Sequence, residues 1–387
     1  MILNNLIVAG TDDPVNIRII DDKIASVLPD AIIDTSDPLT LSFENALVFP
    51  GLINSHDHLD FNLYPQLGQN TYGNYTEWGR YIHKNYKPEI AAVLKVPSVL
   101  RYEWGVFKNL LCGVTTVINH GELSGLKDDL ITIFEHMQTL HSVGFESAWR
   151  FKLNNPLNAK LPVCIHVGEG DDWRSFSEID QLTRWNLLGR TLIGVHAVAM
   201  SEKQAKKFKA LIWCPESNYF LLNKTASINI LKKNAEILFG TDSTLTGNWD
   251  IWEHLRIARQ TRLLDDEELY YTLNQNAAST WALNSGSIEP GKDADIVVAQ
   301  TKKGMRDYHA FFSLRPADLL LVIHRGNVRL FDETVAAQLK TVDLDNFSRV
   351  YVNGACKYVQ GNLPDLMAQI LEYYPGANFP VTTVNAE

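Results

Sequence analysis

The sequence has 387 residues, of which 45% are hydrophobic and 21% charged, a composition typical of a soluble globular protein. The formal net charge of −10 disfavours nucleic acid or an anionic membrane surface as a partner. No segment approaches the roughly 18 consecutive apolar residues of a membrane span, and the N-terminus lacks a signal-peptide pattern. The four cysteines are far apart with no Cys-x-x-Cys pair, which favours free thiols and predicts a cytoplasmic protein.

The two ends of the chain share one pattern. Short apolar and polar pieces alternate at the beginning, separated by turn residues, and similar pieces return near the other end. This pattern is typical of small antiparallel strands. We therefore predict an accessory β-sandwich domain built from both chain ends, residues 1–49 and 286–350. Residues 351–387 are predicted to be a C-terminal tail with an amphipathic helix from Leu363 to Tyr374.

Between these ends, in residues 50–285, short apolar strand patterns alternate with longer amphipathic stretches. Such alternation indicates βα units around a parallel sheet, whose buried strands are near-continuously apolar. At this length the closure that we expect is a distorted (β/α)8 TIM-type barrel, and the fold class is α/β. The stretch between the strands ending near Ile118 and starting near Leu161 is short for two complete units. A helix is therefore expected to be missing or replaced by a loop around residues 150–160.

The middle part begins with a stretch from Phe49 that ends in His56-Asp57-His58. Two residues apart on an extended segment, the two imidazoles project from the same face and can hold one metal ion from one side. Hydrogen-bonded loop histidines are the alternative interpretation of the pair taken alone. Asp57 is expected to point away from the metal and to support structure.

Three more polar residues, His166, His196 and Asp242, each stand where an apolar strand pattern ends. The carboxyl ends of the strands form the active-site face of a parallel barrel, so these side chains are expected to converge. A single histidine at a strand end is more often structural, but the succession of three sites favours a metal centre.

With these motifs the sequence resembles the amidohydrolase superfamily of metal-dependent barrel hydrolases, from about Ile19 to Gly326. Six motifs stand in the family's order: Pro50-Gly-Leu-Ile-Asn-Ser-His-Asp-His58, Gly113-Val-Thr-Thr-Val117, His166-Val-Gly-Glu169, Val195-His196-Ala197, Gly240-Thr-Asp242-Ser243 and Gly291-Lys-Asp-Ala-Asp-Ile-Val-Val298. The family's fold is a distorted (β/α)8 barrel with a β-sandwich formed by both chain ends, which agrees with the organisation predicted above.

The resemblance implies that His56, His58, His166 and Asp242 bind one divalent metal ion. Zinc suits these nitrogen and carboxylate ligands, and iron or manganese would also fit them. Two-metal members of the family use a carboxylated lysine on the fourth strand, and the nearest lysines here follow no clear apolar strand. In such a site the metal lowers the pKa of its bound water to about 7. Asp242 would then act as general base, while His196 would polarise the substrate or steady the nucleophile.

Glu169 points to one branch of the superfamily. A His-x-x-Glu at this place resembles the deaminases and chlorohydrolases, in which the glutamate shuttles a proton to the ring nitrogen; the alternative is a solvated acidic loop. We therefore predict a metal-dependent hydrolase of carbon–nitrogen bonds other than peptide bonds, which deaminates a small heterocycle by attack of a metal-bound hydroxide. Hydrolysis of a cyclic or linear amide or of a carbon–halogen bond is the alternative, and a non-catalytic scaffold is a remote one.

The substrate pocket is less defined by the sequence. The aromatic-rich segment 59–86 either caps a flat ring by stacking or is ordinary loop packing. Four further residues are candidates to line the site: His120, Glu122, Trp213 and Asn218. The remaining histidines, His141 among them, fit no ligand pattern and are expected to be structural or on the surface. The sequence identifies no substrate beyond a small molecule and leaves the oligomeric state open, although dimers are common among similar proteins.

Overall fold

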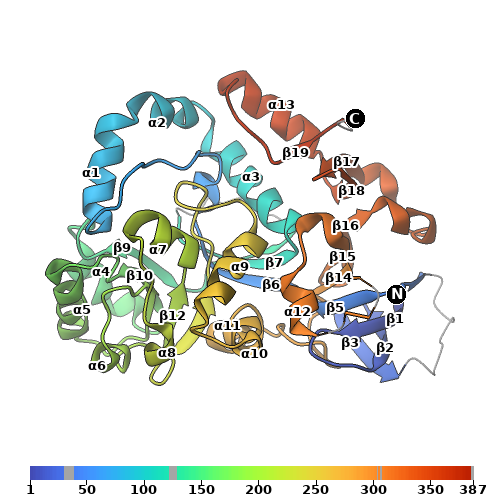
Figure 1. Ribbon diagram of the computed structural model, residues 1–387, viewed down its shortest axis with the longest axis horizontal. Coiled ribbons are helices and arrows are strands. Elements are labelled where there is room, and N and C mark those ends of the chain that lie inside the picture. Colours follow the sequence, from blue (N-terminus) through green and yellow to red (C-terminus); the bar gives the residue numbers. More distant parts are fainter. Residues whose placement is uncertain (30–38, 122–128, 303, 306, 385–387) are drawn as a thin grey trace.

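Two parallel sheets form the middle of the chain in the computed structural model, which describes residues 1–29, 39–121, 129–302, 304–305 and 307–384 (Figure 1). The three-stranded sheet has the order β6-β7-β8: Leu52–Asp57, Val114–Asn119 and Thr132–Phe134. The five-stranded sheet follows the chain order from β9 to β13: Gln138–Ser142, Val163–Val167, Leu192–His196, Ala210–Trp213 and Glu236–Phe239. The amides of Thr241 and Asp242 donate to the carbonyl of His56, so the end of β13 lies beside β6.

The strands of both sheets contribute to one apolar cluster, which explains why their sequences are nearly continuously hydrophobic. This cluster lies beneath the strand ends and includes Ile53, Ile118, Cys164, Ile193, Ile212 and Leu238, all fully buried. Burial of each such side chain stabilises the fold by roughly 2 kcal/mol. The predicted α/β class with parallel strands is confirmed.

Helices follow the strands along the chain and cover the sheets (Figure 1). The larger ones around the first strands are α1 (Tyr75–Asn85), α2 (Lys87–Leu94) and α3 (Ser98–Leu111). After β10, β11 and β12 come α5 (Trp173–Trp185), α6 (Glu202–Ala205), α7 (Pro215–Leu222) and α8 (Ile228–Leu231). After β13 come α9 (Ile251–Thr261), α10 (Asp266–Tyr271) and α11 (Gln275–Trp281). Among the residues described, no helix combines the length and the apolar character needed to cross a membrane.

The incomplete βα unit lies earlier than predicted. Only residues 135–137, all described, lie between β8 and β9, too few for a helix. The region around residues 150–160, where a helix was expected to be missing, contains α4 (Trp149–Leu153) and a 3-10 turn at Pro156–Asn158. The prediction of a missing helix around 150–160 was therefore wrong in position. β8 was not predicted as a strand; it has only three residues, all partly buried.

Strands from both ends of the chain form one 11-stranded sheet (the blue and orange-red part of Figure 1). From the N-terminal part come β1 to β5: Ile2–Val8, Pro14–Ile20, Lys23–Pro29, Thr40–Ser42 and Ala46–Pro50. From the C-terminal part come β14 to β19: Ile296–Gln300, Leu319–His324, Asn327–Asp332, Phe347–Val352, Ala355–Gln360 and Val381–Thr382. The antiparallel pairing of β5 with β14 joins the two halves.

This sheet continues past residue 350, because β18 pairs with both β16 and β17. The predicted start of the tail at residue 351 was therefore too early. β18 was missed since Ala-Cys-Lys-Tyr-Val-Gln contains a buried lysine, Lys357, whose ammonium donates to Asp332 at 2.7 Å. The predicted terminal helix is confirmed as α13 (Leu363–Tyr373), which packs against α3.

Candidate metal centre and active site

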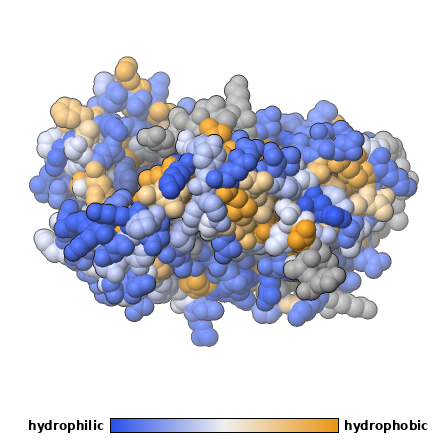
Figure 2. All heavy atoms as spheres, turned by 90° about the horizontal axis from the view of Figure 1, so that it is seen from above, coloured by the Kyte–Doolittle hydropathy of each residue, from blue (hydrophilic) through white to orange (hydrophobic). Residues whose placement is uncertain are grey.

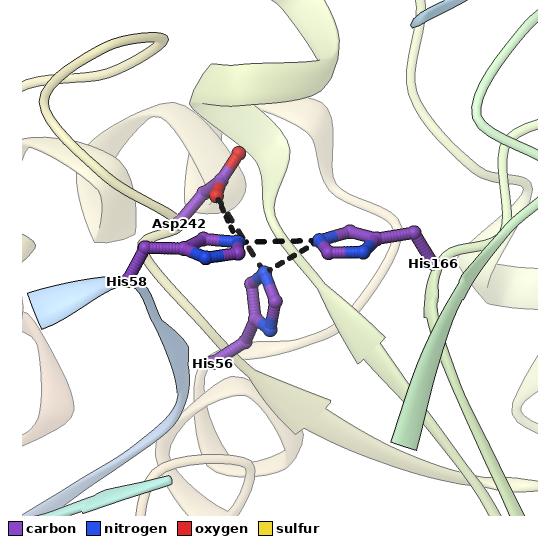
Figure 3. Close-up of side chains that lie close together, drawn as sticks. All are labelled: His56, His58, His166 and Asp242. Carbon is purple, nitrogen blue, oxygen red and sulfur yellow. Dashed lines mark hydrogen bonds and ion pairs between the residues drawn. The ribbon is translucent and has the colours of Figure 1, made fainter. Parts of the chain in front are cut away.

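Three imidazoles and one carboxylate converge at the carboxyl ends of β6, β10 and β13 (Figure 3). The Nε2 atom of His166 lies 3.2 Å from that of His56 and 3.3 Å from that of His58. The Oδ1 atom of Asp242 lies 3.5 Å from Nε2 of His56 and 3.6 Å from Nε2 of His58. All four side chains are buried or nearly so, and their ligand atoms lie within 4.8 Å of one another. The predicted residues thus come together as one group.

The spacing and the protonation of this group fit a divalent cation. Two ligands about 2.1 Å from a tetrahedral ion are roughly 3.4 Å apart, close to the separations found here. The Nδ1 atom of His166 is 2.7 Å from the carbonyl oxygen of His141, so Nδ1 carries the proton and Nε2 presents a lone pair. Burial, reinforced by His56, lowers the pKa of His58 to about 3 and keeps its ring neutral, the form that binds metal.

Asp242 is oriented by its second oxygen. Oδ2 accepts hydrogen bonds from the hydroxyls of Ser217 at 2.8 Å and Thr246 at 2.9 Å, which leaves Oδ1 facing the imidazoles. The backbone of Asp242 has a φ of +57°, a left-handed conformation that costs a non-glycine residue roughly 1 kcal/mol. His196 has a φ of +70° in the same way. Such strain is concentrated at functional sites, where the fold holds side chains in place.

His196 and Glu169 form a second pair beside this group. The Nε2 atom of His196 is 3.6 Å from Oε1 of Glu169, and its Nδ1 is 2.9 Å from the side-chain amide of Asn218. Because that amide donates to Nδ1, the proton of the neutral ring is on Nε2, on the side of Glu169. Burial, with a further contribution from the charge of Asp242, raises the pKa of Glu169 well above its usual range.

The alternative of a solvated acidic loop does not describe Glu169, whose side chain is buried. The two aspartates that follow it have separate roles. Asp171 pairs with Lys224, and Asp172 caps α5 by accepting from the amide of Ser175 at 2.8 Å. Glu169 is thus the member of this acidic run that reaches the candidate active site.

Comparison with known proteins agrees with this geometry. The model of the amidohydrolase family matches residues 158–329, which include His166, His196 and Asp242. This match, over less than half of the chain, confirms its resemblance to the amidohydrolase superfamily. The chain is 25% identical over 162 residues to the 5-methylthioadenosine/S-adenosylhomocysteine deaminase of Thermococcus sibiricus; the match covers 36% of this chain and only 38% of that relative.

Two solved structures resemble this chain over nearly their whole length. An adenosine deaminase from Xanthomonas campestris with bound zinc has a TM-score of 0.70 and 17% identity, covering 96% of this chain and 98% of that one. The atrazine chlorohydrolase of Arthrobacter aurescens, complexed with zinc, has a TM-score of 0.68 and 16% identity, covering 97% and 100%. Identities this low establish the fold and leave the substrate open.

Two features of the candidate site were not predicted. His141, expected to be structural or on the surface, orients His166 through its carbonyl oxygen, and its ring lies 5.1 Å from that of His166. Lys108, on α3, is buried and donates to the carboxylate of Asp57 at 3.0 Å. Asn109 donates to the same carboxylate at 2.7 Å. Asp57 therefore points away from the imidazoles, as predicted, into a buried polar layer that supports β6.

The residues predicted to line the site differ in where the structure places them. His120 is buried at the site, with its ring 4.4 Å from that of His166, and Asn218 contacts His196. Trp213 belongs instead to the hydrophobic core, where its Nε1 donates to Thr225 at 2.6 Å. Glu122 lies outside the described residues. From the aromatic segment, Phe61 stacks on His58 with 5.4 Å between ring centroids.

Proposed function

We propose that this amidohydrolase deaminates a small nitrogen heterocycle with one divalent metal ion, zinc by preference, held by His56, His58, His166 and Asp242. The observation that carries the proposal is the buried Glu169, with its raised pKa, beside His196 at the edge of a group whose spacing fits the metal. The relatives named above as deaminases support it. We further infer that the two parallel sheets are arcs of one (β/α)8 barrel and that the terminal sheet is its accessory domain.

Each residue has a separate task in this proposal. A bound divalent ion supplies an activated water near neutral pH. Asp242 accepts a proton of the attacking water at Oδ1, while Ser217 and Thr246 hold Oδ2. Glu169 is protonated at neutral pH, since burial raises its pKa, and it delivers that proton to the ring nitrogen next to the attacked carbon. His196 donates from Nε2 to the oxygen that is added to the ring.

The same site offers a second reaction, displacement of halide from a ring carbon, because a chlorohydrolase has a similar fold. A halide leaves without a proton, whereas an amine must gain one to leave as ammonia. The proton that Asp242 takes from the attacking water can pass to the amine, while Glu169 protonates the ring nitrogen in either reaction. Deamination is favoured because the relatives named above are deaminases. A scaffold without activity is disfavoured, because all four candidate ligands are present and converge.

The test is product analysis on a panel of rings. Purified protein loaded with zinc, iron or manganese is incubated with purine, pyrimidine, triazine and pterin amines, and ammonia is measured; chlorinated rings and cyclic amides are assayed in parallel. We expect ammonia release from at least one amine and a metal content near one ion per chain. Turnover of amides or chlorinated rings without any ammonia would overturn the deaminase proposal.

We also infer a cytoplasmic location and a small-molecule substrate, without nucleic acid or membrane partners. All four cysteines are free and three of them are buried, which suits a reducing compartment.

A further inference from the structure

We propose that the heterocycle carries an anionic substituent on an apolar linker, and that this substituent is bound by basic residues of α1 and of the start of α2. The proposal rests on the proposed deaminase function and names the class of substrate. It is carried by a cavity that lies next to the candidate metal centre and is lined by apolar walls and a basic rim.

The cavity has a volume of about 650 Å³, within the usual size of small-molecule sites of roughly 300–1,000 Å³. Three of its lining residues connect it to the candidate active site. Phe61 stacks on His58, His141 binds His166 through its carbonyl, and Leu245 is three residues beyond Asp242. A ring placed at the metal centre can therefore extend its substituent into this cavity.

The walls of the cavity are apolar and aromatic. They are formed by Tyr64, Trp78, Ile82, Ile90 and Phe145. The indole N–H of Trp78 already donates to the carbonyl of Leu67 at 2.7 Å, so it is not available to a ligand. Phe145 is 49% exposed and lies against α1 at Gly79, where an added Cβ would be 3.0 Å from its ring. An alkyl or aromatic linker suits such walls, because its apolar surface is removed from water there, which is favourable.

The far rim of the cavity is basic. Arg80, His83, Lys84 and Lys87 all line it and are exposed, and the described lining contains no aspartate or glutamate. Arg80, His83 and Lys84, at spacings of three and four residues, share one face of α1, and Lys87 is the first residue of α2. Among the residues that the structure describes, none of the four pairs with a carboxylate, and the hydrogen bonds of Arg80 go to Thr76. Such a rim is unusual for a chain with a net charge of −10.

Three acidic residues near the rim in sequence or space do not form ion pairs with it: Glu77, Glu146 and Glu89, whose buried Oε2 has no hydrogen-bond partner among the described residues. Glu77 accepts from the amide of Gly73 at 3.0 Å, and Glu146 accepts from the amide of His141 at 2.8 Å and pairs with Lys152. Figure 2, which views the molecule from the side of α1 and α2, shows hydrophobic patches between hydrophilic residues on this face. An unneutralised basic rim at the end of an apolar cavity suits a carboxylate or a phosphate, which share the negative charge that ammonium and guanidinium groups bind.

The experiment compares matched substrates. Adenine, guanine and cytosine are each prepared with a pentyl, a 4-carboxybutyl or a 4-phosphonobutyl group, and kcat/KM for ammonia release is measured. We expect the anionic compounds of the accepted ring to exceed the pentyl compound by about tenfold, the combined effect of several exposed ion pairs. The better of the two anions identifies the carboxylate or the phosphate class. Equal values for pentyl and anionic compounds would overturn the subsite while leaving the deaminase function intact.

Reversing the charges of the basic rim tests whether these residues cause the preference for anionic substrates. The triple variant Arg80→Glu, Lys84→Glu, Lys87→Glu should bring the ratio of anionic to pentyl kcat/KM down to about one or below. The matched control Lys203→Glu, Lys206→Glu, Lys207→Glu, on α6 and the exposed turn that follows it, should keep the wild-type ratio. A preference that survives reversal of the rim would overturn the proposal.

If no ring is deaminated, the proposed function fails and the subsite is judged by binding alone. Calorimetry then compares 4-phenylbutyrate with 4-phenylbutanol on wild-type protein and the triple variant. Tighter binding of the carboxylate that is lost in the variant supports the subsite. Equal binding of the two compounds to wild-type protein overturns it.

Discussion

At the scale of single residues, three functional side chains are oriented by a partner that occupies another of their polar atoms. Asp242 is held by two hydroxyls at Oδ2, His196 by an amide at Nδ1, and His166 by a backbone carbonyl at Nδ1. The free atoms of Asp242 and His166 point toward the same place (Figure 3), and Nε2 of His196 faces Glu169. Such fixed orientation lowers the reorganisation needed when the charge distribution changes during reaction.

Glu169→Gln is expected to lower ammonia release by roughly 10² to 10⁴-fold, because the amide cannot deliver a proton to the ring. Metal content and far-ultraviolet circular dichroism should stay as in wild-type protein, since Glu169 is not among the candidate ligands. The matched control is Asp171→Asn, a neighbouring acid that pairs with Lys224 away from the site. Activity close to wild type in Glu169→Gln would remove this residue from the mechanism.

Asp242→Asn is expected to abolish turnover while the fold is retained, because the amide cannot accept the proton of the attacking water. The hydroxyls of Ser217 and Thr246 can still bond to the remaining side-chain oxygen. Kinetics and thermal unfolding, measured on the same preparation, check both parts. Retained turnover would contradict the assignment of Asp242 as general base.

At the scale of elements, α3 supports the active-site strand β6 through a buried ion pair. The side chains of Lys108 and Asp57 are 2% and 0% exposed, and Asn62 donates to the other carboxylate oxygen at 2.8 Å. Because Asp57 stands between two candidate ligands on β6, this pair ties the metal centre to a helix that precedes the next strand. Removing both charged groups from water costs free energy that offsets the attraction between them. The pair therefore chiefly orients Asp57 and adds little net stability.

Lys108→Met should destabilise the protein by about 3 kcal/mol, because it leaves the buried carboxylate of Asp57 without its cation. Urea unfolding provides the measurement, and Lys95→Met, at an exposed position after α2, is the control that should change little. The double variant Asp57→Asn, Lys108→Met should recover most of the loss. If the double variant is no more stable than the single one, the two side chains are not coupled.

At the scale of the whole molecule, the terminal sheet contacts the parallel strands through His324. This residue ends β15, and its Nε2 is 2.9 Å from the hydroxyl of Thr132 on β8. Burial, reinforced by the charge of Arg329, lowers the pKa of His324 from its ordinary 6.5 to about 4. The contact between the two parts of the protein therefore depends on a neutral imidazole.

The sign of the resulting pH dependence follows from this shift. The folded state resists protonation of His324. The contribution of the neutral His324 ring to the free energy of unfolding is therefore complete above pH 6.5 and is lost as the pH falls toward 4. Between pH 7 and pH 4.5, wild-type protein should lose about 2 to 3 kcal/mol more unfolding free energy than His324→Gln. Urea unfolding at both pH values provides the comparison, and parallel losses in the two proteins would contradict it.

The sequence by itself determined the candidate ligands and the parallel strands that carry them. Histidine and aspartate at the ends of apolar runs can be recognised from the local sequence. The residue type indicates that the side chain can bind a metal, and the end of the run indicates that it lies at the end of a strand. These signals place His56, His58, His166, His196 and Asp242 at strand ends, and the resemblance to the amidohydrolase superfamily implies which four of them would be ligands. The alternation of strands and helices could also be predicted from local patterns.

Only the tertiary structure decided which distant residues support these ligands. Nothing near Lys108 in the sequence shows that its ammonium meets Asp57, because that contact depends on how α3 packs on β6. The contact of His141 with His166 depends in the same way on the register between β9 and β10. The basic rim, too, becomes a candidate subsite only because α1 borders a cavity whose lining residues Phe61 and His141 contact the candidate ligands. Local sequence patterns report burial and conformation, whereas such contacts between distant segments arise only when the chain is packed.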